Sequence, residues 1–314
     1  MRDKIPLHSF QWNIDRLNLK ENGTSLTGCF KPKIALIDSG IDYNHVEFIN
    51  KINLEESYNF LDDAESIIDN IGHGTMVAGI ICADNLIRGC FSNVELIVYK
   101  ITDEFEYKVK NLLSAIKRAI ESNVQIINLS LSLPFEKLNE DAIELFCKEF
   151  EKANKNNIII VIAAGNGNKE ISKNFTNQFN NVFLIGATDR KGLKSSYSNY
   201  GSIDYLAPGG DWRQVEYSLD DPIITCFPMH LSTMDALNNN IGFPKGYCVS
   251  YGTSIAAAHF TGSIAYLMVH YANMTSKILT LNEIHLLLNK SVNYNLQPQY
   301  SLNGEISFSN VRIN

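Results

Sequence analysis

The sequence has no long uncharged apolar stretch anywhere in its 314 residues. Its N-terminus, MRDKIPLHSFQWNIDRL, lacks an apolar core of the length that a secretory signal requires. The longest candidate for a membrane span, residues 255–268, is interrupted by polar residues such as His259 and Ser263 and by Gly262. We therefore expect a cytoplasmic protein without membrane insertion, unless a signal segment is missing from the sequence.

Cysteine is scarce, and no excess of positive charge balances the acidic residues. The six cysteines form no CxxC pair and no dense framework, so free buried thiols are expected rather than disulfides. With 27 Lys and Arg against 34 Asp and Glu, the net charge of -7 argues against a nucleic-acid partner. The histidines lack HExxH spacing and form no cluster with the cysteines, so no metal ion and no other cofactor is expected.

Internal repeats, low-complexity tracts and Pro- or Ser-rich linkers are also missing, so nothing marks a boundary between two domains. With 45% hydrophobic and 19% charged residues, the chain can bury a large core. We predict one domain over residues 31–314, preceded by an N-terminal extension, residues 1–30, that packs on it. Residues 209–246, rich in Gly, Asp, Asn and Pro, are predicted to form a long surface excursion beside the site.

What the chain does have is an alternation of short apolar runs with helical patterns. Residues 111–122 and 138–153 each place apolar side chains on one helical face. Because internal parallel strands are covered on both sides, runs that are apolar on both faces predict such strands. These runs are residues 33–38, 94–100, 124–131, 158–164 and 182–188. The pattern predicts a single-domain α/β fold with a mostly parallel central sheet and helices on both faces.

Polar residues that end the apolar runs are candidate site residues, because active and binding sites in open parallel sheets lie at the carboxyl ends of the strands. The first run ends in Asp38, and the fourth is followed by Asn166 between two glycines. His73, also between glycines, stands just before a helix of small residues predicted over residues 76–83. Ser254 opens the helix predicted over residues 255–271, where backbone N–H groups have no partner within the helix.

Taken singly, each of these four residues has an ordinary structural explanation. An Asp or Ser caps a helix, an Asn between glycines forms a turn, and a lone His packs in a loop. Together they supply what acyl transfer needs: a nucleophile, a base, a carboxylate that orients the base and a donor for the oxyanion. The combination therefore predicts a hydrolase with a serine nucleophile.

The segments that carry these residues resemble the motifs of the subtilisin-like serine peptidases. IALIDSGID, GHGTMVAGI and GTSIAAAHFTG are similar to the family's aspartate, histidine and serine motifs in the family's order, and VIAAGNGN to its oxyanion motif. The resemblance implies a serine endopeptidase that works through an acyl-enzyme. It makes Ser254 the nucleophile, His73 the general base and then acid, and Asp38 the group that fixes the imidazole tautomer. Asn166 and the Ser254 backbone N–H become the oxyanion donors.

The resemblance also implies how a peptide substrate binds. A strand over residues 128–131 would take the substrate backbone as an additional strand, and residues 130–132 and 163–165 would line the first specificity pocket. The far wall would lie near residues 173–175. The implied substrate-binding residues are Asn128, Leu129, Ser130, Leu131, Ser132, Ala163, Ala164, Gly165 and Asn174. None is acidic, although Glu170 is near, so we predict that Gln is preferred over Leu, and both over Arg, before the cut.

The sequence departs from the family's pattern at several places. Ile255 and Ala258 replace the usual Met and Pro of the serine motif, and Ser132 replaces a Gly. Residues 83–95 are too short for the family's calcium-binding loop. Glu47 stands where that site has an aspartate, but one carboxylate is not a calcium site. We expect no bound calcium there.

A finer placement within the family follows from the N-terminus and from residues 207–211, APGGD. About thirty residues precede the first strand, and the family's usual prosegment is not among them. The chain looks most like the bacterial leader peptidases of lantibiotic biosynthesis, which implies a modified precursor peptide as substrate and biosynthetic enzymes as candidate partners. The alternatives are a general intracellular subtilisin and an inactive binding module. An α/β-hydrolase is disfavoured, because GTSIA lacks the second glycine of that fold's nucleophile elbow.

Overall fold

The apolar runs form the centre of a sheet in the computed structural model, which describes residues 7–19, 30–61, 66–104, 106–133, 138–172, 174–212, 221–293, 301 and 303–307. The five central strands follow the predicted ranges closely. They are β1 (Lys33–Asp38), β3 (Glu95–Lys100), β4 (Ile126–Ser132), β5 (Ile159–Ala163) and β7 (Val182–Thr188). These strands are parallel and almost wholly buried.

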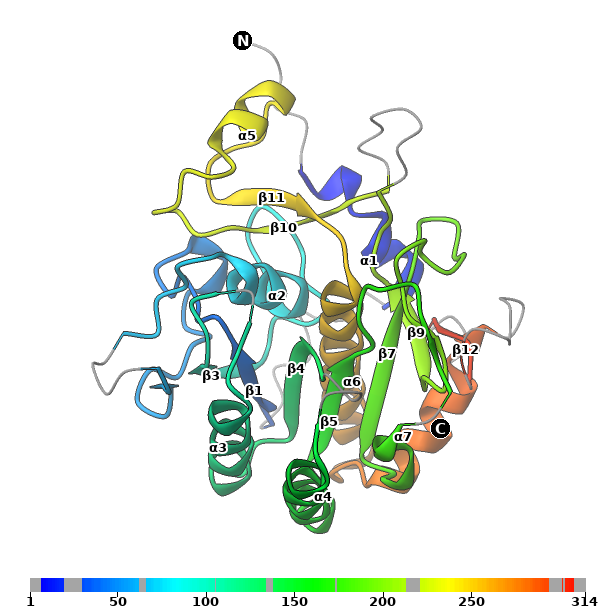
Figure 1. Ribbon diagram of the computed structural model, residues 1–314. Helices are drawn as coiled ribbons and strands as arrows, with labels where there is room; N and C mark the ends of the chain where they lie inside the picture. Colours follow the sequence, from blue (N-terminus) through cyan, green and yellow to red (C-terminus); the bar gives the residue numbers. More distant parts are fainter. Residues whose placement is uncertain are drawn as a thin grey trace.

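Short strands extend this core at both edges: β2 (Tyr58–Asn59), β9 (Tyr205–Pro208), β12 (Val292–Asn293) and β13 (Glu305–Ile306). The order across the nine-stranded sheet is β12-β13-β9-β7-β5-β4-β1-β3-β2 (Figure 1). Among its described strands, only the β12 and β13 pair is antiparallel. The predicted α/β class with a mostly parallel sheet is therefore confirmed.

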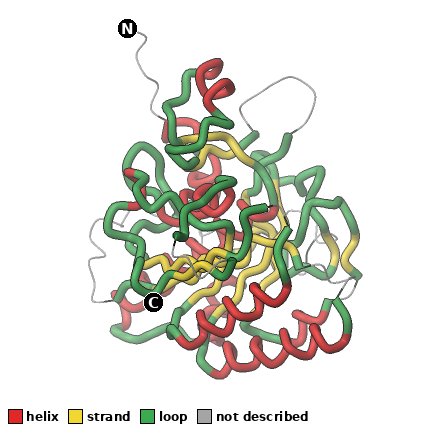
Figure 2. The backbone as a smooth tube through the Cα atoms, turned by 60° about the vertical axis from the view of Figure 1, so that its left-hand side comes forward, coloured by secondary structure: helices red, strands yellow, loops and turns green. Residues whose placement is uncertain are grey.

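Helices cover both faces of the sheet, as Figures 1 and 2 show. On one face, α3 (Val109–Glu121) and α4 (Glu140–Lys155) bury the apolar stripes that the sequence predicted. On the other face lie α1 (Trp12–Leu17), α2 (His73–Cys82), α6 (Thr253–Thr275) and α7 (Leu281–Lys290). Nearly every residue of the first four turns of α6 is buried, because this helix packs against α2 and against β4, β5 and β7.

The helices α2 and α6 begin earlier than the sequence indicated, at His73 instead of Met76 and at Thr253 instead of Ile255. A glycine with positive φ precedes each of them, Gly72 at +96° and Gly252 at +145°. Glycine can turn sharply into a helix at such a position, whereas other residues would be strained. As a result, both His73 and Ser254 lie in the first turn of a helix.

Of residues 209–246, predicted to form a long surface excursion beside the site, the described parts, 209–212 and 221–246, include regular structure. They contain β10 (Ile223–Cys226) and α5 (Asp235–Ile241), and β10 pairs with β11 (Tyr247–Ser250) in an antiparallel hairpin. The hairpin packs on α2, where the hydroxyl of Thr225 donates to the Met76 carbonyl at 2.6 Å. A Cβ at Gly72 would meet the ring of Phe227 at 2.3 Å, so the segment following β10 lies directly against the turn that precedes His73.

The described part of the N-terminal extension packs on the domain. Asn13 in α1 and His259 in α6 are hydrogen bonded at 2.7 Å and are both fully buried. Arg16 forms an ion pair with Glu305 of β13 at 2.7 Å. Residues 1–6 and 20–29 lie outside the described ranges, so the proposed boundary at residue 30 stays a prediction.

Small elements complete the description: β6 (Glu170–Ile171) paired with β8 (Tyr200–Gly201), and the 3-10 helices η1 (Leu7–Phe10), η3 (Val46–Phe48) and η5 (Phe175–Gln178). In the ranges given above, no helix is both long enough and apolar enough to cross a membrane. The described cysteines, Cys82, Cys90, Cys147, Cys226 and Cys248, are free thiols. Burial raises the pKa of Cys82 to about 12, so this thiol stays protonated and unreactive at neutral pH.

Candidate active site

The four predicted catalytic side chains line one cleft at the carboxyl ends of the central strands. Asp38 ends β1, Asn166 follows β5, and the first turns of α2 and α6 bring His73 and Ser254. The same cleft is lined by Ser130, Leu131, Ser132, Ala163 and Gly165 from the implied substrate-binding set. The arrangement therefore unites residues that lie more than two hundred positions apart in the chain.

Asp38 and His73 are joined by a direct hydrogen bond. The Oδ1 atom of Asp38, whose side chain is fully buried, lies 2.7 Å from Nδ1 of His73. The backbone N–H of Ser39 donates to the same oxygen at 2.8 Å. Because an ionised carboxylate can only accept, the proton of the neutral imidazole belongs on Nδ1, and Nε2 is left as its basic nitrogen.

Opposing effects act on the pKa of His73. Burial of the imidazole is the largest and lowers the pKa. The charge and hydrogen bond of Asp38 raise it, with a smaller contribution from Asp69, and these effects together prevail, so the pKa is raised above its ordinary value of 6.5. The imidazolium that forms during proton transfer is therefore stabilised.

This pKa shift predicts a pH dependence of activity. A base must be neutral to accept a proton, so a raised pKa moves the loss of activity to higher pH. We expect the acid limb of a plot of kcat/KM against pH to have a midpoint above 6.5, the ordinary value for histidine. Initial rates measured from pH 5 to 9 test this expectation. An acid limb centred below 6 would contradict the assignment of His73 as the base.

Sequence reasoning missed Asp69, a fully buried carboxylate four residues before His73. Its Oδ1 accepts from the Ser39 hydroxyl at 2.8 Å and from Gly72 N–H at 2.8 Å, and its Oδ2 accepts from the N–H and hydroxyl of Thr75 at 2.8 and 2.7 Å. Ser39 follows Asp38, whereas Gly72 and Thr75 flank His73. The Asp69 side chain thus joins the segment after Asp38 to the first turn of α2, which carries His73.

The side chains of Ser254 and Asn166 both approach Gly252. A Cβ placed on Gly252 would be 3.1 Å from Ser254 Oγ and 3.6 Å from Asn166 Nδ2, so only a glycine leaves this space open. Asn166 Oδ1 accepts from the N–H and hydroxyl of Thr253 at 3.0 and 2.8 Å. Its oxygen is thereby committed, and its NH2 group is the part that can donate to an oxyanion formed beside Ser254.

The implied substrate-binding strand needs a correction. Asn128 and Leu129 pair with β5, and Asn128 also pairs with β1, so neither backbone can bind a peptide. The buried Asn128 side chain instead donates to Ser130 Oγ and accepts from Thr261, while Ser130 Oγ donates to the Ser254 carbonyl at 2.9 Å. Asn128 therefore holds α6 in place. Pairing is interrupted after Leu129, where residues 130–132 reach the cleft.

The predicted lining of the first specificity pocket also needs a correction. Asn174 does not line the cleft, because its side chain caps η5 through the N–H groups of Thr176 and Asn177 and donates to the Ser202 carbonyl. Ala164 is buried in the sheet and is not among the lining residues. Glu170 lies exposed on β6, away from the lining, and residue 173 lies outside the described ranges. Fewer residues therefore line the cleft than the resemblance implied.

Glu47 takes a role different from binding a cation. Its buried carboxylate accepts from the four successive N–H groups of residues 84–87, at 2.6 to 3.2 Å, and from the Tyr247 hydroxyl at 2.7 Å. These donors use the lone pairs that a calcium ion would need. Across the described ranges, no group of three His, Cys, Asp or Glu residues could hold a metal ion.

We predict that the stability of the protein does not depend on calcium, because N–H donors occupy the Glu47 carboxylate. Thermal unfolding in EDTA and in millimolar calcium should give the same midpoint. A tight site saturated by calcium would add several kcal/mol to the free energy of unfolding and raise the midpoint by several degrees. A calcium-dependent rise of that size would contradict the prediction.

Comparisons with known proteins agree on one family. A family model described as the subtilase family matches residues 31–303. The epidermin leader peptide-processing serine protease of Staphylococcus epidermidis is 28% identical over 280 residues, which cover 75% of this chain and 59% of that protein. A thermophilic serine proteinase of Bacillus sp. (strain AK1) is 30% identical, covering 57% of this chain and 44% of that protein. The chain therefore spans about half the length of these curated relatives.

Solved structures show the same fold. A lanthipeptide protease superposes with a TM-score of 0.82 at 24% identity, covering 96% of this chain and 93% of that one. The nisin leader peptidase of Lactococcus lactis superposes with a TM-score of 0.72 at 23% identity, covering 95% and 93%. At 23–24% identity these similarities establish the fold of the chain and nothing more specific.

Proposed function

Because the chain belongs to the subtilase family of serine peptidases, we propose that it is a serine endopeptidase that removes the leader from a modified precursor peptide. One observation carries the chemistry. The hydrogen-bonded pair of Asp38 and His73 shares a cleft with Ser254, and Ser254 Oγ and the Asn166 NH2 group both lie next to Gly252. The similarity to an epidermin leader-processing protease supports the choice of substrate.

The mechanism follows from these positions. Ser254 Oγ attacks the carbonyl carbon of the bond to be cut, and Nε2 of His73 takes its proton while Asp38 stabilises the imidazolium. The Asn166 NH2 and the Ser254 backbone N–H donate to the oxyanion of the tetrahedral intermediate. His73 then protonates the leaving amine, which releases the core peptide. A water molecule activated by the same histidine hydrolyses the remaining acyl-enzyme.

The leader would bind in an extended conformation along residues 130–132, where the pairing of β4 with β5 is interrupted after Leu129 and resumes at Ser132. Backbone hydrogen bonds at this segment would hold the residues before the cut irrespective of their side chains. Truncating the leader there should lower kcat as well as affinity, because remote contacts help to position the reacting bond.

Mass spectrometry of the purified protein incubated with leader-containing precursor peptides tests the function. A dedicated leader peptidase should cut one bond, at the junction of leader and core, and should leave an unfolded protein such as casein largely intact. Cutting of casein at many bonds would favour a general protease instead. A serine-directed phosphonate that fails to label Ser254, together with no cleavage of any peptide, would indicate an inactive binding module.

The first specificity pocket should accept an uncharged residue of moderate length. No acid lies among residues 130–132, 163 and 165, and a buried cation without a partner is costly. Asn174 lies outside the lining and the Ser130 hydroxyl is bonded to the Ser254 carbonyl, so the Ser132 hydroxyl remains as a polar group. We expect kcat/KM to be highest for Gln, lower for Leu and at least about tenfold lower for Arg in matched peptides. An Arg peptide cut faster than the Gln peptide would overturn this expectation.

A further inference from the structure

The cleft has two walls, and the catalytic residues lie between them. One wall consists of the ends of β4 and β5, with residues 130–132, Ala163 and Gly165. The other consists of Thr102 and Glu104, which follow β3, and of Ile71, which precedes His73. Since β1 runs between β4 and β3, its last residue, Asp38, marks the boundary between the two walls.

An extended peptide on residues 130–132 must present its side chains alternately to these walls, because successive side chains of a strand point in opposite directions. The residue before the cut enters the pocket at the ends of β4 and β5. The residue before that one is therefore directed to the other wall. Its surroundings are Ile71, His73, Thr102 and Glu104.

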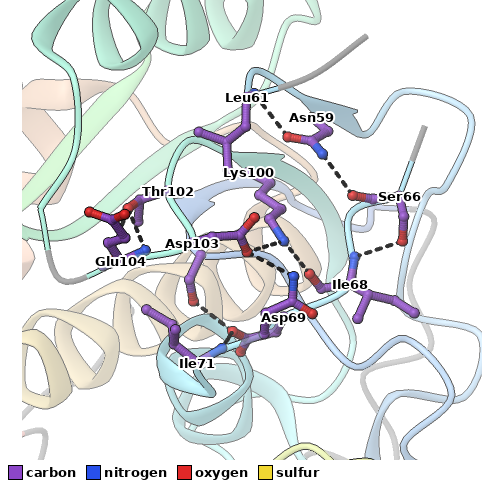
Figure 3. A network of polar contacts seen from close by, with 12 residues as sticks. Asn59, Leu61, Ser66, Ile68, Asp69, Ile71, Lys100, Thr102, Asp103 and Glu104 are labelled. Atoms are coloured by element: carbon purple, nitrogen blue, oxygen red, sulfur yellow. Dashed lines mark hydrogen bonds and ion pairs between the residues drawn. The ribbon is translucent and has the colours of Figure 1, made fainter. Parts of the chain in front are cut away.

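The turn that carries Glu104 is held in place by its own hydrogen bonds. The Thr102 hydroxyl donates to the Glu104 carbonyl at 2.9 Å and accepts from its N–H at 3.0 Å. At the end of the turn, the Tyr107 hydroxyl donates to the Ser132 carbonyl at 2.8 Å, which links the two walls. Figure 3 shows Glu104 and Thr102 next to each other beyond the end of β3.

The two carboxylates of this segment, Asp103 and Glu104, differ in whether a cation pairs with them. Asp103 forms an ion pair with Lys100 at 2.5 Å (Figure 3). It also accepts from the Asn70 amide at 2.9 Å. The carboxylate of Glu104 is exposed, and no Lys or Arg pairs with it in the described part of the chain. The cleft lining that the structure describes contains no Lys or Arg either. An incoming cation would find Glu104 available.

We propose that Glu104 selects a basic side chain, Lys or Arg, at the second position before the cut. The aliphatic stem of such a residue would lie against Ile71 and the Thr102 methyl group, and its charged end would reach the Glu104 carboxylate. This subsite rests on the proposed peptidase function. It assigns a basic residue to the second position, while the first position takes an uncharged one.

Matched peptides with Gln fixed at the first position and Lys, Gln or Leu at the second test the subsite. For the wild-type protein we expect kcat/KM to be about fivefold higher with Lys than with Leu, the size of a good exposed ion pair. Glu104→Gln should abolish this preference by lowering the rate with Lys toward the rate with Leu. Glu106→Gln is the matched control, because Glu106 is an exposed acid of the same turn that does not line the cleft. It should keep the preference.

Salt concentration and peptide binding provide independent evidence. The preference for Lys should shrink in 1 M salt, because exposed charges are screened over a few ångströms there. If the wild-type protein cuts no peptide, the proposed function fails, but affinities of the same peptides for the uncut protein still test the subsite. Equal rates or affinities for Lys and Leu in the wild-type protein would overturn the proposal. A preference that survives in Glu104→Gln would do so as well.

Discussion

Ser254→Ala should abolish peptide turnover, with a loss of about 10⁶-fold in kcat, the size seen when the nucleophile of subtilisin is removed. The substitution deletes one hydroxyl and little volume. The Ser254 carbonyl still accepts from Ser130 Oγ at 2.9 Å, so the first turn of α6 keeps its anchor. The fold should therefore be unchanged.

Single-turnover mass spectrometry measures this loss, and circular dichroism with thermal unfolding serves as the control for folding. The variant should still bind the precursor, because residues 130–132, where we propose that the substrate binds, are unchanged. Wild-type rates of cleavage by a folded Ser254→Ala protein would refute the assignment of the nucleophile. Loss of binding together with turnover would instead point to a damaged cleft.

Asn166→Ala should lower kcat by about 10² to 10³ with little change in KM, the loss known for the equivalent donor in subtilisin. The reason is that, in the proposed mechanism, the Asn166 NH2 group donates to negative charge that develops only in the transition state. The side chain also accepts two hydrogen bonds from Thr253, so truncation removes an anchor of α6 as well.

Two further variants separate these effects. Asn166→Asp keeps an oxygen for the Thr253 donors but replaces the NH2 donor with an acceptor, so it should lose at least as much kcat as the alanine variant. Thr253→Val removes the hydroxyl that bonds to Asn166 and leaves the NH2 group in place. It should retain most of the activity. A loss confined to KM in Asn166→Ala would mean that this residue binds the ground state and has no oxyanion role.

The long apolar runs were predictable because burial on both faces of a parallel sheet leaves a strong compositional pattern. The ranges of β1 and β7 agree with the prediction at both ends. The short strands β10 and β11 were not predictable, since four residues in a segment rich in Gly, Asn and Asp give no clear periodicity. β10 is buried by contact with α2, a partner far away in the sequence.

The polar residues singled out from the sequence also divide into those whose role could be predicted and those whose role could not. The four catalytic candidates could be found because each stands in a recognisable motif. Asn128 is fully buried, and its partners lie on β4 and α6. No local pattern distinguishes a residue that braces a helix from one that binds a substrate. Asn174 did carry a local signal, since an Asn two residues before a Thr commonly caps a turn. The pocket interpretation overrode that signal.

Asp69 has a consequence for how the protein loses activity under stress. Its carboxylate connects the loop after β1 to the first turn of α2, so neither segment can open without breaking the bonds of the other. Regions joined in this way exchange their amide hydrogens as one cooperative unit. Mild denaturation should therefore displace Asp38 and His73 from the active site together. At intermediate denaturant the protein would then be a mixture of fully active and fully inactive molecules, without a population of reduced activity.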